Sequence, residues 1–319
     1  LDISSELRRL LPANWAGSLA SLEHVQARGE LQFRCQGDLE HTPQFVIDGQ
    51  IRNGRLDDAR LPYPLNDISA HLLITNDKIQ LSKCTATMAG AAVQINGQLD
   101  QWLEAAKLTI HATASGFTLD PRIRAVLAER ARTTWDRFRP SGLVDLGLTI
   151  EWEAGIEPRW DAAMTCRDVS IIYQLFPYPL HHLQGVIRFG PTYFQTDNLV
   201  ASAAGTPLRI DAKLQIAPGN WAGDVALSTA GVDSSIDGTV PIDRQLIGAL
   251  SPSAQEFVAK LQPTGRILLK HAIFEKKGFD STLQQSIQID VVDGSLVFTD
   301  FPYPLTRVAG TLSSQNSRW

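Results

Sequence analysis

The stretch Leu-Pro-Tyr-Pro-Leu at residues 61–65 recurs as Phe-Pro-Tyr-Pro-Leu at residues 176–180 and again at residues 301–305. The first prolines lie 115 residues apart (177 − 62) and then 125 residues apart (302 − 177). Proline fixes φ and has no amide donor, and the residue before it is driven to an extended conformation. Each copy is therefore predicted to form a stiff corner between two strands, outside any central ladder.

The flanking Leu or Phe and the Tyr ring are expected to pin each corner to the hydrophobic core. The alternative is a tyrosine-based binding site that is repeated three times, and we favour the structural role. The corner residues are Pro62, Tyr63, Pro64, Pro177, Tyr178, Pro179, Pro302, Tyr303 and Pro304.

An internal duplication underlies this recurrence. After the first two corners the chain aligns with itself without a gap at an offset of 115, so that Gln80 falls on Gln195 and Gly90 on Gly205. Each unit also has a glycine that opens a strand and, before it, a helical stretch that begins near an aspartate, which is a favourable N-cap. The glycines are Gly29, Gly142 and Gly265, and the aspartates are Asp2, Asp120 and Asp243.

The predicted domains are therefore residues 1–118, residues 119–242 and an incomplete third unit at residues 243–319. Because the third unit stops just after its corner, we expect the chain to be a fragment of a longer protein.

The strands within each unit alternate between apolar and polar residues. One example is the run from residue 208 to residue 216, in which Leu208, Ile210, Ala212, Leu214 and Ile216 alternate with Arg209, Asp211, Lys213 and Gln215. Such strands bury one face and leave the other in water, which is typical of antiparallel sheets. The sequence predicts a mainly β fold with inserted helices, in which repeated antiparallel units stack into an elongated, curled sheet.

Residues 121–139 are the clearest predicted helix. Ile123, Val126, Leu127, Trp135 and Phe138 fall on one face at 100° per residue, and six arginines flank it. We expect an amphipathic helix that packs on the sheet with its arginine heads in water. The alternative is a helix that contacts anionic lipid head groups. Pro12 and Pro252 should split or kink the equivalent helices of the first and third units.

Composition and net charge argue against some classes of function. Of the 319 residues, 44% are hydrophobic and 20% are charged, and the net charge of −5 argues against a general nucleic-acid binder. No segment has the ~18 apolar residues of a membrane span, and no signal-peptide pattern is present.

Cys35, Cys84 and Cys166 are predicted to be buried or partly buried free thiols. A disulfide between Cys35 and Cys84 is the alternative if the protein is periplasmic.

Local motifs for metal binding, nucleophilic catalysis and phosphate binding are absent from the sequence. The adjacent pair His181 and His182 would point to opposite faces of a strand, which suits a single metal ion poorly. We therefore expect no cofactor, no metal and no enzymatic activity, although a catalytic site assembled from distant residues would leave no local trace.

Two segments of the second unit resemble those of a known protein family: Leu-Gln-Gly-Val-Ile-Arg-Phe at residues 183–189 and the run from Asn198 to Ile210. Residues 68–74 and 85–95 echo them in the first unit. This pattern of short strands joined by hairpins rich in Ala and Gly resembles the repeating pattern of the AsmA-like superfamily of Gram-negative envelope proteins.

The resemblance implies an apolar β-groove in the periplasm, anchored to the inner membrane by a segment outside this sequence. It also implies a role in phospholipid transport between the two membranes or in outer-membrane biogenesis. The implied partners are phospholipid acyl chains and membrane proteins at either end of the envelope. Candidate groove residues are Ile95, Leu99, Leu148, Ile150, Ile187, Phe189, Leu208, Ile210 and Leu214.

Three alternatives remain at this point. The apolar face could be ordinary core, or the chain could be a periplasmic or secreted β-rich module that binds glycan or a protein partner. A hydrolase with a dispersed site is the third. Exposed aromatic rows would favour glycan, and the tryptophans available for them are Trp15, Trp102, Trp152, Trp160 and Trp221.

Overall fold

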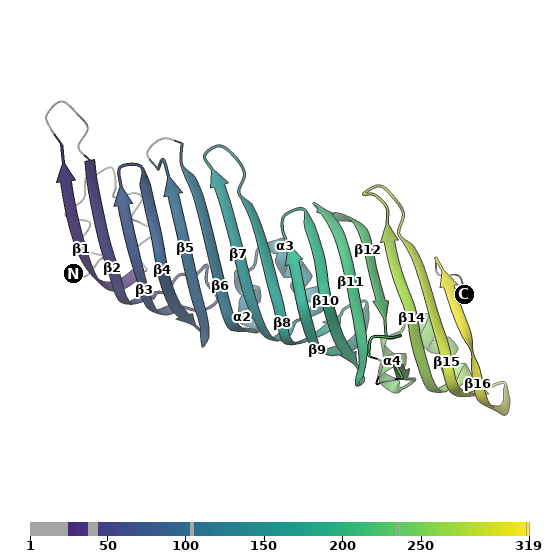
Figure 1. Ribbon diagram of the computed structural model, residues 1–319. Helices are drawn as coiled ribbons and strands as arrows, with labels where there is room; N and C mark the ends of the chain where they lie inside the picture. The colour runs from purple at the N-terminus through teal and green to yellow at the C-terminus, as the bar shows by residue number, and fades with distance from the viewer. Residues whose placement is uncertain are drawn as a thin grey trace. The chain divides into compact units, whose positions relative to one another are not determined.

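The computed structural model describes residues 25–37, 44–102, 105–233, 235, 237–316 and 318. Its strands belong to one antiparallel sheet of 16 strands, and nearly every strand lies beside the strand that precedes it in the chain (Figure 1). The exception is the short strand β13, which pairs with β14. The predicted mainly β, antiparallel fold class is confirmed.

The chain divides into two compact units. Unit 1 contains residues up to Val126 together with Val144–Ala163, and unit 2 contains Leu127–Leu143 and the residues from Met164 onward. The strands of unit 1 are β1 (Val25–Gln36), β2 (Gln44–Leu56), β3 (Leu65–Thr75), β4 (Lys78–Met88), β5 (Ala91–Asp100) and β6 (Lys107–Leu119). Two strands contribute to both units, β7 (Ser141–Glu153) and β8 (Arg159–Tyr173).

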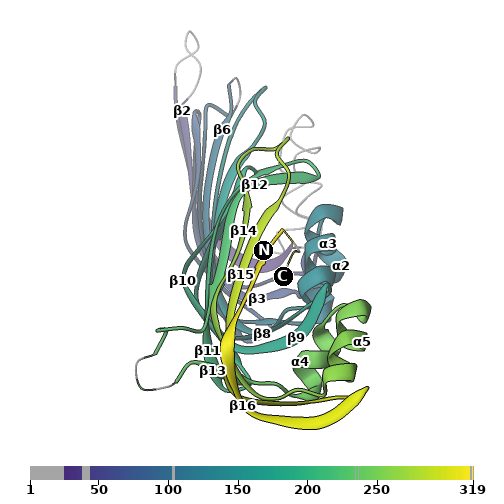
Figure 2. The ribbon, with the colours of Figure 1, turned by 90° about the vertical axis from the view of Figure 1, so that its right-hand side faces the viewer.

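The strands of unit 2 are β9 (Phe176–Phe189), β10 (Tyr193–Ala203), β11 (Thr206–Ala217), β12 (Asn220–Ser228), β13 (Thr239–Pro241), β14 (Thr264–Lys276), β15 (Gln284–Phe298) and β16 (Phe301–Gln315). Helix α2 (Pro121–Val126) belongs to unit 1, and α3 (Glu129–Phe138), α4 (Arg244–Ala249) and α5 (Pro252–Leu261) belong to unit 2. The three helices of unit 2 lie on the same side of its strands (Figure 2). None of the described helices is both long and apolar enough to cross a membrane.

The repeat in sequence is accompanied by a repeat in backbone conformation. Asp67, His182 and Arg307 each lie five residues after the first proline of a motif, and their φ angles are 54°, 53° and 56°. Each lies at a shift in strand register, where one extra residue bends the strand. A positive φ is uncommon for residues other than glycine, so its occurrence at the same place in all three copies indicates that the bend belongs to the repeated unit.

The glycines predicted to open strands have a steric reason in two copies. Gly142 and Gly265 are the second residues of β7 and β14, with φ of 127° and 115°. A Cβ atom would lie 2.1 Å from the carbonyl oxygen of Asp168 in the first case and 2.5 Å from that of Asp293 in the second. Only glycine permits both this backbone conformation and this close approach.

The prediction that each Pro-Tyr-Pro motif forms a corner between two strands is wrong for two of its three copies. Residues 61–64 do form a bend before β3, but the second and third copies are the first residues of β9 and β16. Pro304 even lies opposite Val297 in the register of β15 and β16. Prolines two residues apart remove donors from the same edge of a strand, so the other edge can still pair.

The prediction of one continuous helix over residues 121–139 is also wrong. The helix is broken at Leu127 and Ala128, between α2 and α3, although no proline marks the break. The predicted split at Pro252 is confirmed, because Ser251 caps α5 and Pro252 is its first residue. The stretch around Pro12 lies outside the described residues.

Candidate functional site: the apolar face of the sheet

In unit 1 the ladder register aligns apolar side chains across six consecutive strands. Residues directly opposite each other in an antiparallel ladder point to the same face. One row, read from β1 to β6, consists of Phe33, Ile47, Ile74, Ile79, Leu99 and Leu108. The adjacent row on the same face consists of Leu31, Gly49, Leu72, Leu81, Gly97 and Ile110.

The opposite face of the same strands is largely polar. The row between the two apolar rows points the other way and consists of Gln32, Asp48, Leu73, Gln80, Gln98 and Thr109. On this face His71 contacts Asp48, with 2.7 Å between Nε2 and Oδ1, and its Nδ1 lies 3.3 Å from the hydroxyl of Ser82. The sheet of unit 1 therefore has one apolar and one hydrated face.

The apolar face continues onto β7. Nδ1 of His111 lies 3.1 Å from the hydroxyl of Thr149, and His111 points to the polar face because it lies opposite Asn96 in β5. Leu148 and Ile150 flank Thr149, so their side chains point to the apolar face. All four groove residues predicted in unit 1, which also include Ile95 and Leu99, thus share one face.

Unit 2 has the same arrangement. Phe189, Phe194 and Leu214 lie opposite one another across β9, β10 and β11. A second row on this face runs from β10 to β15 and consists of Leu199, Ile210, Leu227, Ala272 and Ile287. The five groove residues predicted in unit 2 therefore point to the face that carries its helices.

Burial of this face is uneven along the strands. Near the second Pro-Tyr-Pro motif, Leu208 is buried in a cluster with Tyr178 and Ala249 of α4, and Ile210 packs against that cluster. Leu65, Ala86 and Val93 form the corresponding cluster of unit 1, against which Ile95 packs. Of the nine predicted residues only Leu208 is buried, and the other eight are half-buried. Sealed core occupies one end of the strands, and the rest of the face is partly accessible.

Helix α3 covers this face only loosely. It is attached at its two ends: a guanidinium nitrogen of Arg130 donates to the carbonyl oxygen of Ala217 over 3.1 Å, and the amide of Gln174 donates to the carbonyl oxygen of Arg137 over 2.7 Å. The ring of Phe138 stacks on Tyr173 at 5.0 Å between centroids. No residue of α3 is buried, in contrast to Ile123 of α2 and Ala249 of α4.

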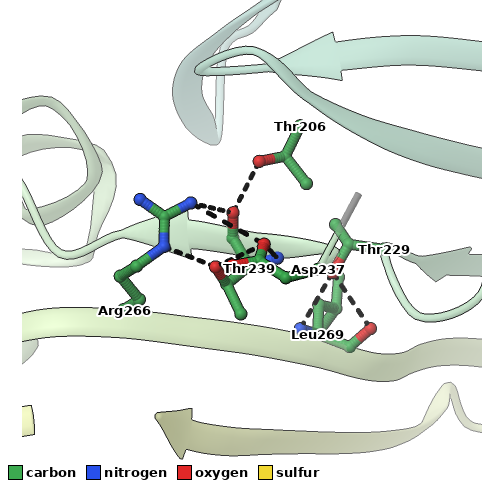
Figure 3. A network of polar contacts seen from close by, with 6 residues as sticks. All are labelled: Thr206, Thr229, Asp237, Thr239, Arg266 and Leu269. Carbon is green, nitrogen blue, oxygen red and sulfur yellow. Dashed lines mark hydrogen bonds and ion pairs between the residues drawn. The ribbon is translucent and has the colours of Figure 1, made fainter. Parts of the chain in front are cut away.

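A partly buried polar network fixes the segment that leads from β12 to α4 (Figure 3). The hydroxyl of Thr206 donates to the carbonyl oxygen of Thr239 over 2.5 Å, and Nη2 of Arg266 donates to the same oxygen over 2.8 Å. Nε of Arg266 bonds the hydroxyl of Thr239. The amide of Leu269 donates to the hydroxyl of Thr229 over 3.1 Å. These bonds satisfy polar groups of Thr239 in β13 and of Thr229 before it, so the network is structural.

The tyrosines of the three motifs have different surroundings. The hydroxyl of Tyr63 donates to the carboxylate of Asp120, and this bond raises the pKa of Tyr63 and lowers the pKa of Asp120. Tyr178 is buried, whereas Tyr303 is 64% exposed. This pairing of tyrosine with an N-cap aspartate was not predicted from the sequence, although the predicted N-caps Asp120 and Asp243, which follow the first two motifs in the chain, were a visible signal.

The remaining predicted residues do not form a site. Cys84 and Cys166 are buried free thiols, and burial raises the pKa of Cys166 to about 11. Cys35 is also free but exposed, which corrects the prediction that all three thiols are buried or partly buried. His181 and His182 are exposed on β9. Among the described residues, no cluster of His, Cys, Asp and Glu could hold a metal ion.

Trp152 and Trp160 lie on the neighbouring strands β7 and β8, Trp221 lies on β12, and Trp102 follows β5. Trp15 lies outside the described residues. The accessible part of the apolar face is mainly aliphatic. No model of a known protein family, no curated protein and no solved structure matches this chain.

Proposed function

We propose that this chain binds phospholipid acyl chains along the apolar face of its sheet and serves as a segment of a lipid conduit. The observation that carries the proposal is the row of apolar side chains that continues across β1 to β6 while the opposite face is largely polar. A second supporting observation is that most of this face is only half-buried.

The physical basis is the hydrophobic effect. Each methylene that leaves water contributes about 0.8 kcal/mol, so an acyl chain gains more from a long aliphatic face than from a single pocket of short length. Neighbouring rows of the face are chemically alike, so a lipid can move from one strand to the next without a large barrier. The charged head group stays at the hydrated rim, where its solvation is not lost.

The wider setting of the proposal rests on the resemblance to the AsmA-like superfamily. We place the chain in the periplasm as part of a larger protein held at the inner membrane, with membrane proteins as partners at each end of the conduit. The proposed role is binding and transfer of lipid rather than catalysis, in phospholipid transport or outer-membrane biogenesis.

Native mass spectrometry of the purified chain, with lipid extraction from the same sample, tests the proposal. We expect phospholipid to copurify with the wild-type protein from a Gram-negative host. Leu99→Asp and Leu214→Asp should reduce the bound lipid at least tenfold, because each places a charge in the half-buried part of the face. These positions are preferred to Ile210, which packs against the core cluster near α4.

Matched controls lie on the same strands. Gln94→Asp in β5 and Gln215→Asp in β11 introduce the same charge on the opposite, exposed face and should leave lipid binding unchanged. A folded wild-type chain that holds no lipid, even after incubation with phosphatidylethanolamine and phosphatidylglycerol vesicles, would contradict the proposal. The apolar face would then be ordinary core, and a β-rich binding or scaffold module would be the better description.

A further inference from the structure

The first two Pro-Tyr-Pro motifs are each covered by a helix that an aspartate begins. In unit 1 the hydroxyl of Tyr63 donates to the carboxylate of Asp120, whose other carboxylate oxygen accepts the amide of Arg122 over 2.8 Å at the start of α2. The guanidinium of Arg122 lies 5.3 Å from the centroid of the Tyr63 ring. The motif thus holds the N-terminus of the helix.

The second motif repeats the arrangement in unit 2. Asp243 is the N-cap of α4, and its Oδ1 accepts the amide of Leu246 over 2.8 Å. Leu246 and Ala249 of this helix pack on the cluster that contains Tyr178, which is only 5% exposed. In both copies the tyrosine therefore lies near an Asp-capped helix that has an apolar residue three positions after the cap, and in the first copy the tyrosine hydroxyl also donates to the cap carboxylate.

The third motif has the same shape, but no such helix among the described residues covers it. The rings of Phe301 and Tyr303 lie 6.4 Å apart at 33°, close to the 6.1 Å and 38° of Phe176 and Tyr178. Yet Tyr303 is 64% exposed, whereas Tyr178 is 5% exposed. Leu305, which follows the same alternation, is 48% exposed.

We propose that Phe301, Tyr303 and Leu305 form a docking site for a short amphipathic helix with an Asp N-cap. The tyrosine hydroxyl would donate to the cap carboxylate, and the apolar residue of the first turn would cover the two rings. The occupant is thus defined by its chemistry, a helix of the type formed by residues 243–249. The proposal does not depend on lipid binding.

A helix is a better occupant than a lipid for this patch. The ring pair of the third motif has nearly the geometry of the pair in the second motif, where Tyr178 packs in a cluster with Ala249 of α4, so docking requires little rearrangement. A phenol hydroxyl that becomes covered needs an acceptor, which an acyl chain does not supply. The first motif supplies this acceptor as the carboxylate of Asp120 at the start of α2.

Fluorescence anisotropy with a labelled synthetic peptide of residues 241–262 tests the site. This peptide contains α4, α5 and the Asp243 cap. We expect saturable binding to the full chain and at least a tenfold loss of affinity on Tyr303→Ala. The same loss is expected for a peptide with Asp243→Ser, because serine keeps an N-cap oxygen but lacks the carboxylate.

Thr306→Ala is the matched control, because Thr306 is exposed on β16 and points away from the face of Tyr303 and Leu305. It should bind the peptide like the wild type. A hydrocarbon-stapled form of the peptide removes the cost of helix formation. If the stapled helix does not bind, or binds the Tyr303→Ala chain equally well, the proposal is wrong.

Discussion

The tyrosine of the repeated motif contributes differently to stability in different copies, because its surroundings differ. The hydroxyl of Tyr63 donates a hydrogen bond to the carboxylate of Asp120, and this charge-assisted bond offsets the cost of removing the hydroxyl from water. The hydroxyl of Tyr178 is buried and has no hydrogen-bond partner among the described residues. Burial, reinforced by the nearby carboxylate of Asp243, raises the pKa of Tyr178. Identical motifs therefore need not respond identically to mutation.

Tyrosine-to-phenylalanine substitutions should have opposite effects in the two units. Tyr63→Phe removes a satisfied hydrogen bond and should lower the urea midpoint of the chain. Tyr178→Phe removes an unsatisfied buried hydroxyl and should raise the free energy of unfolding by about 1 kcal/mol. Equilibrium urea unfolding followed by circular dichroism measures both. A loss of stability in Tyr178→Phe would mean that its hydroxyl has a partner.

The pair of Tyr63 and Asp120 should also make stability depend on pH. The hydrogen bond lowers the pKa of Asp120, so its contribution is present above the unfolded-state pKa of about 3.9 and is lost as the pH falls through the lower folded-state value. The raised pKa of Tyr63 has the opposite sense, with a contribution present below about pH 10 and lost above it. Urea midpoints measured from pH 7 to pH 2 should fall less steeply in Tyr63→Phe than in the wild type. Parallel curves would show that the bond does not form in solution.

The three thiols should react at different rates. At pH 8 a thiol with a pKa of about 11 is thiolate in only about one molecule in a thousand, so buried Cys166 should resist alkylation. Burial also raises the pKa of Cys84, which should be protected as well. Exposed Cys35 should react first, and mass spectrometry after a timed iodoacetamide pulse identifies the labelled residue. If none of the three thiols is labelled without urea, Cys35 is not accessible in the folded protein and the prediction is wrong.

At the scale of the element, the network of Figure 3 decides how β13 is held against β14. Thr206→Val keeps the shape of the buried side chain and removes its bond to the carbonyl oxygen of Thr239, so it should cost about 1 kcal/mol of unfolding free energy. Thr206→Ser keeps the hydroxyl and should cost less than Thr206→Val. Urea unfolding of the two variants measures the difference, and equal losses would assign the effect to packing rather than to the hydrogen bond.

The elements also show what the sequence can and cannot reveal. Alternation assigned Leu208 and Ile210 to one face correctly, because the pleat of a strand has a strict period of two. The break between α2 and α3 was invisible, because Ala128 is a good helix former and only its extended backbone (ψ 153°) interrupts the helix. The bond of Tyr63 to Asp120 joins residues 57 positions apart and depends on tertiary packing.

At the scale of the whole molecule, the central question is how much of the apolar face is core. In β5 of unit 1 the answer changes along a single strand: Val93 is 6% exposed in a core cluster, whereas Leu99, six residues further along the same face, is half-buried. A face that was core throughout would be sealed at both positions. The gradient is the physical condition for a surface that is both stably folded and able to bind an apolar ligand.

Three aspartate substitutions in β5 measure this gradient directly. Val93→Asp should cost more than about 3 kcal/mol, because it leaves an unpaired charge in the core. Leu99→Asp should cost about 1–2 kcal/mol, since its carboxylate can reach water. Gln94→Asp, on the polar face, should stay within about 0.5 kcal/mol of the wild type. If equilibrium unfolding gives equal losses at Val93 and Leu99, the far end of the strand is sealed in solution, and an acyl chain has no place there.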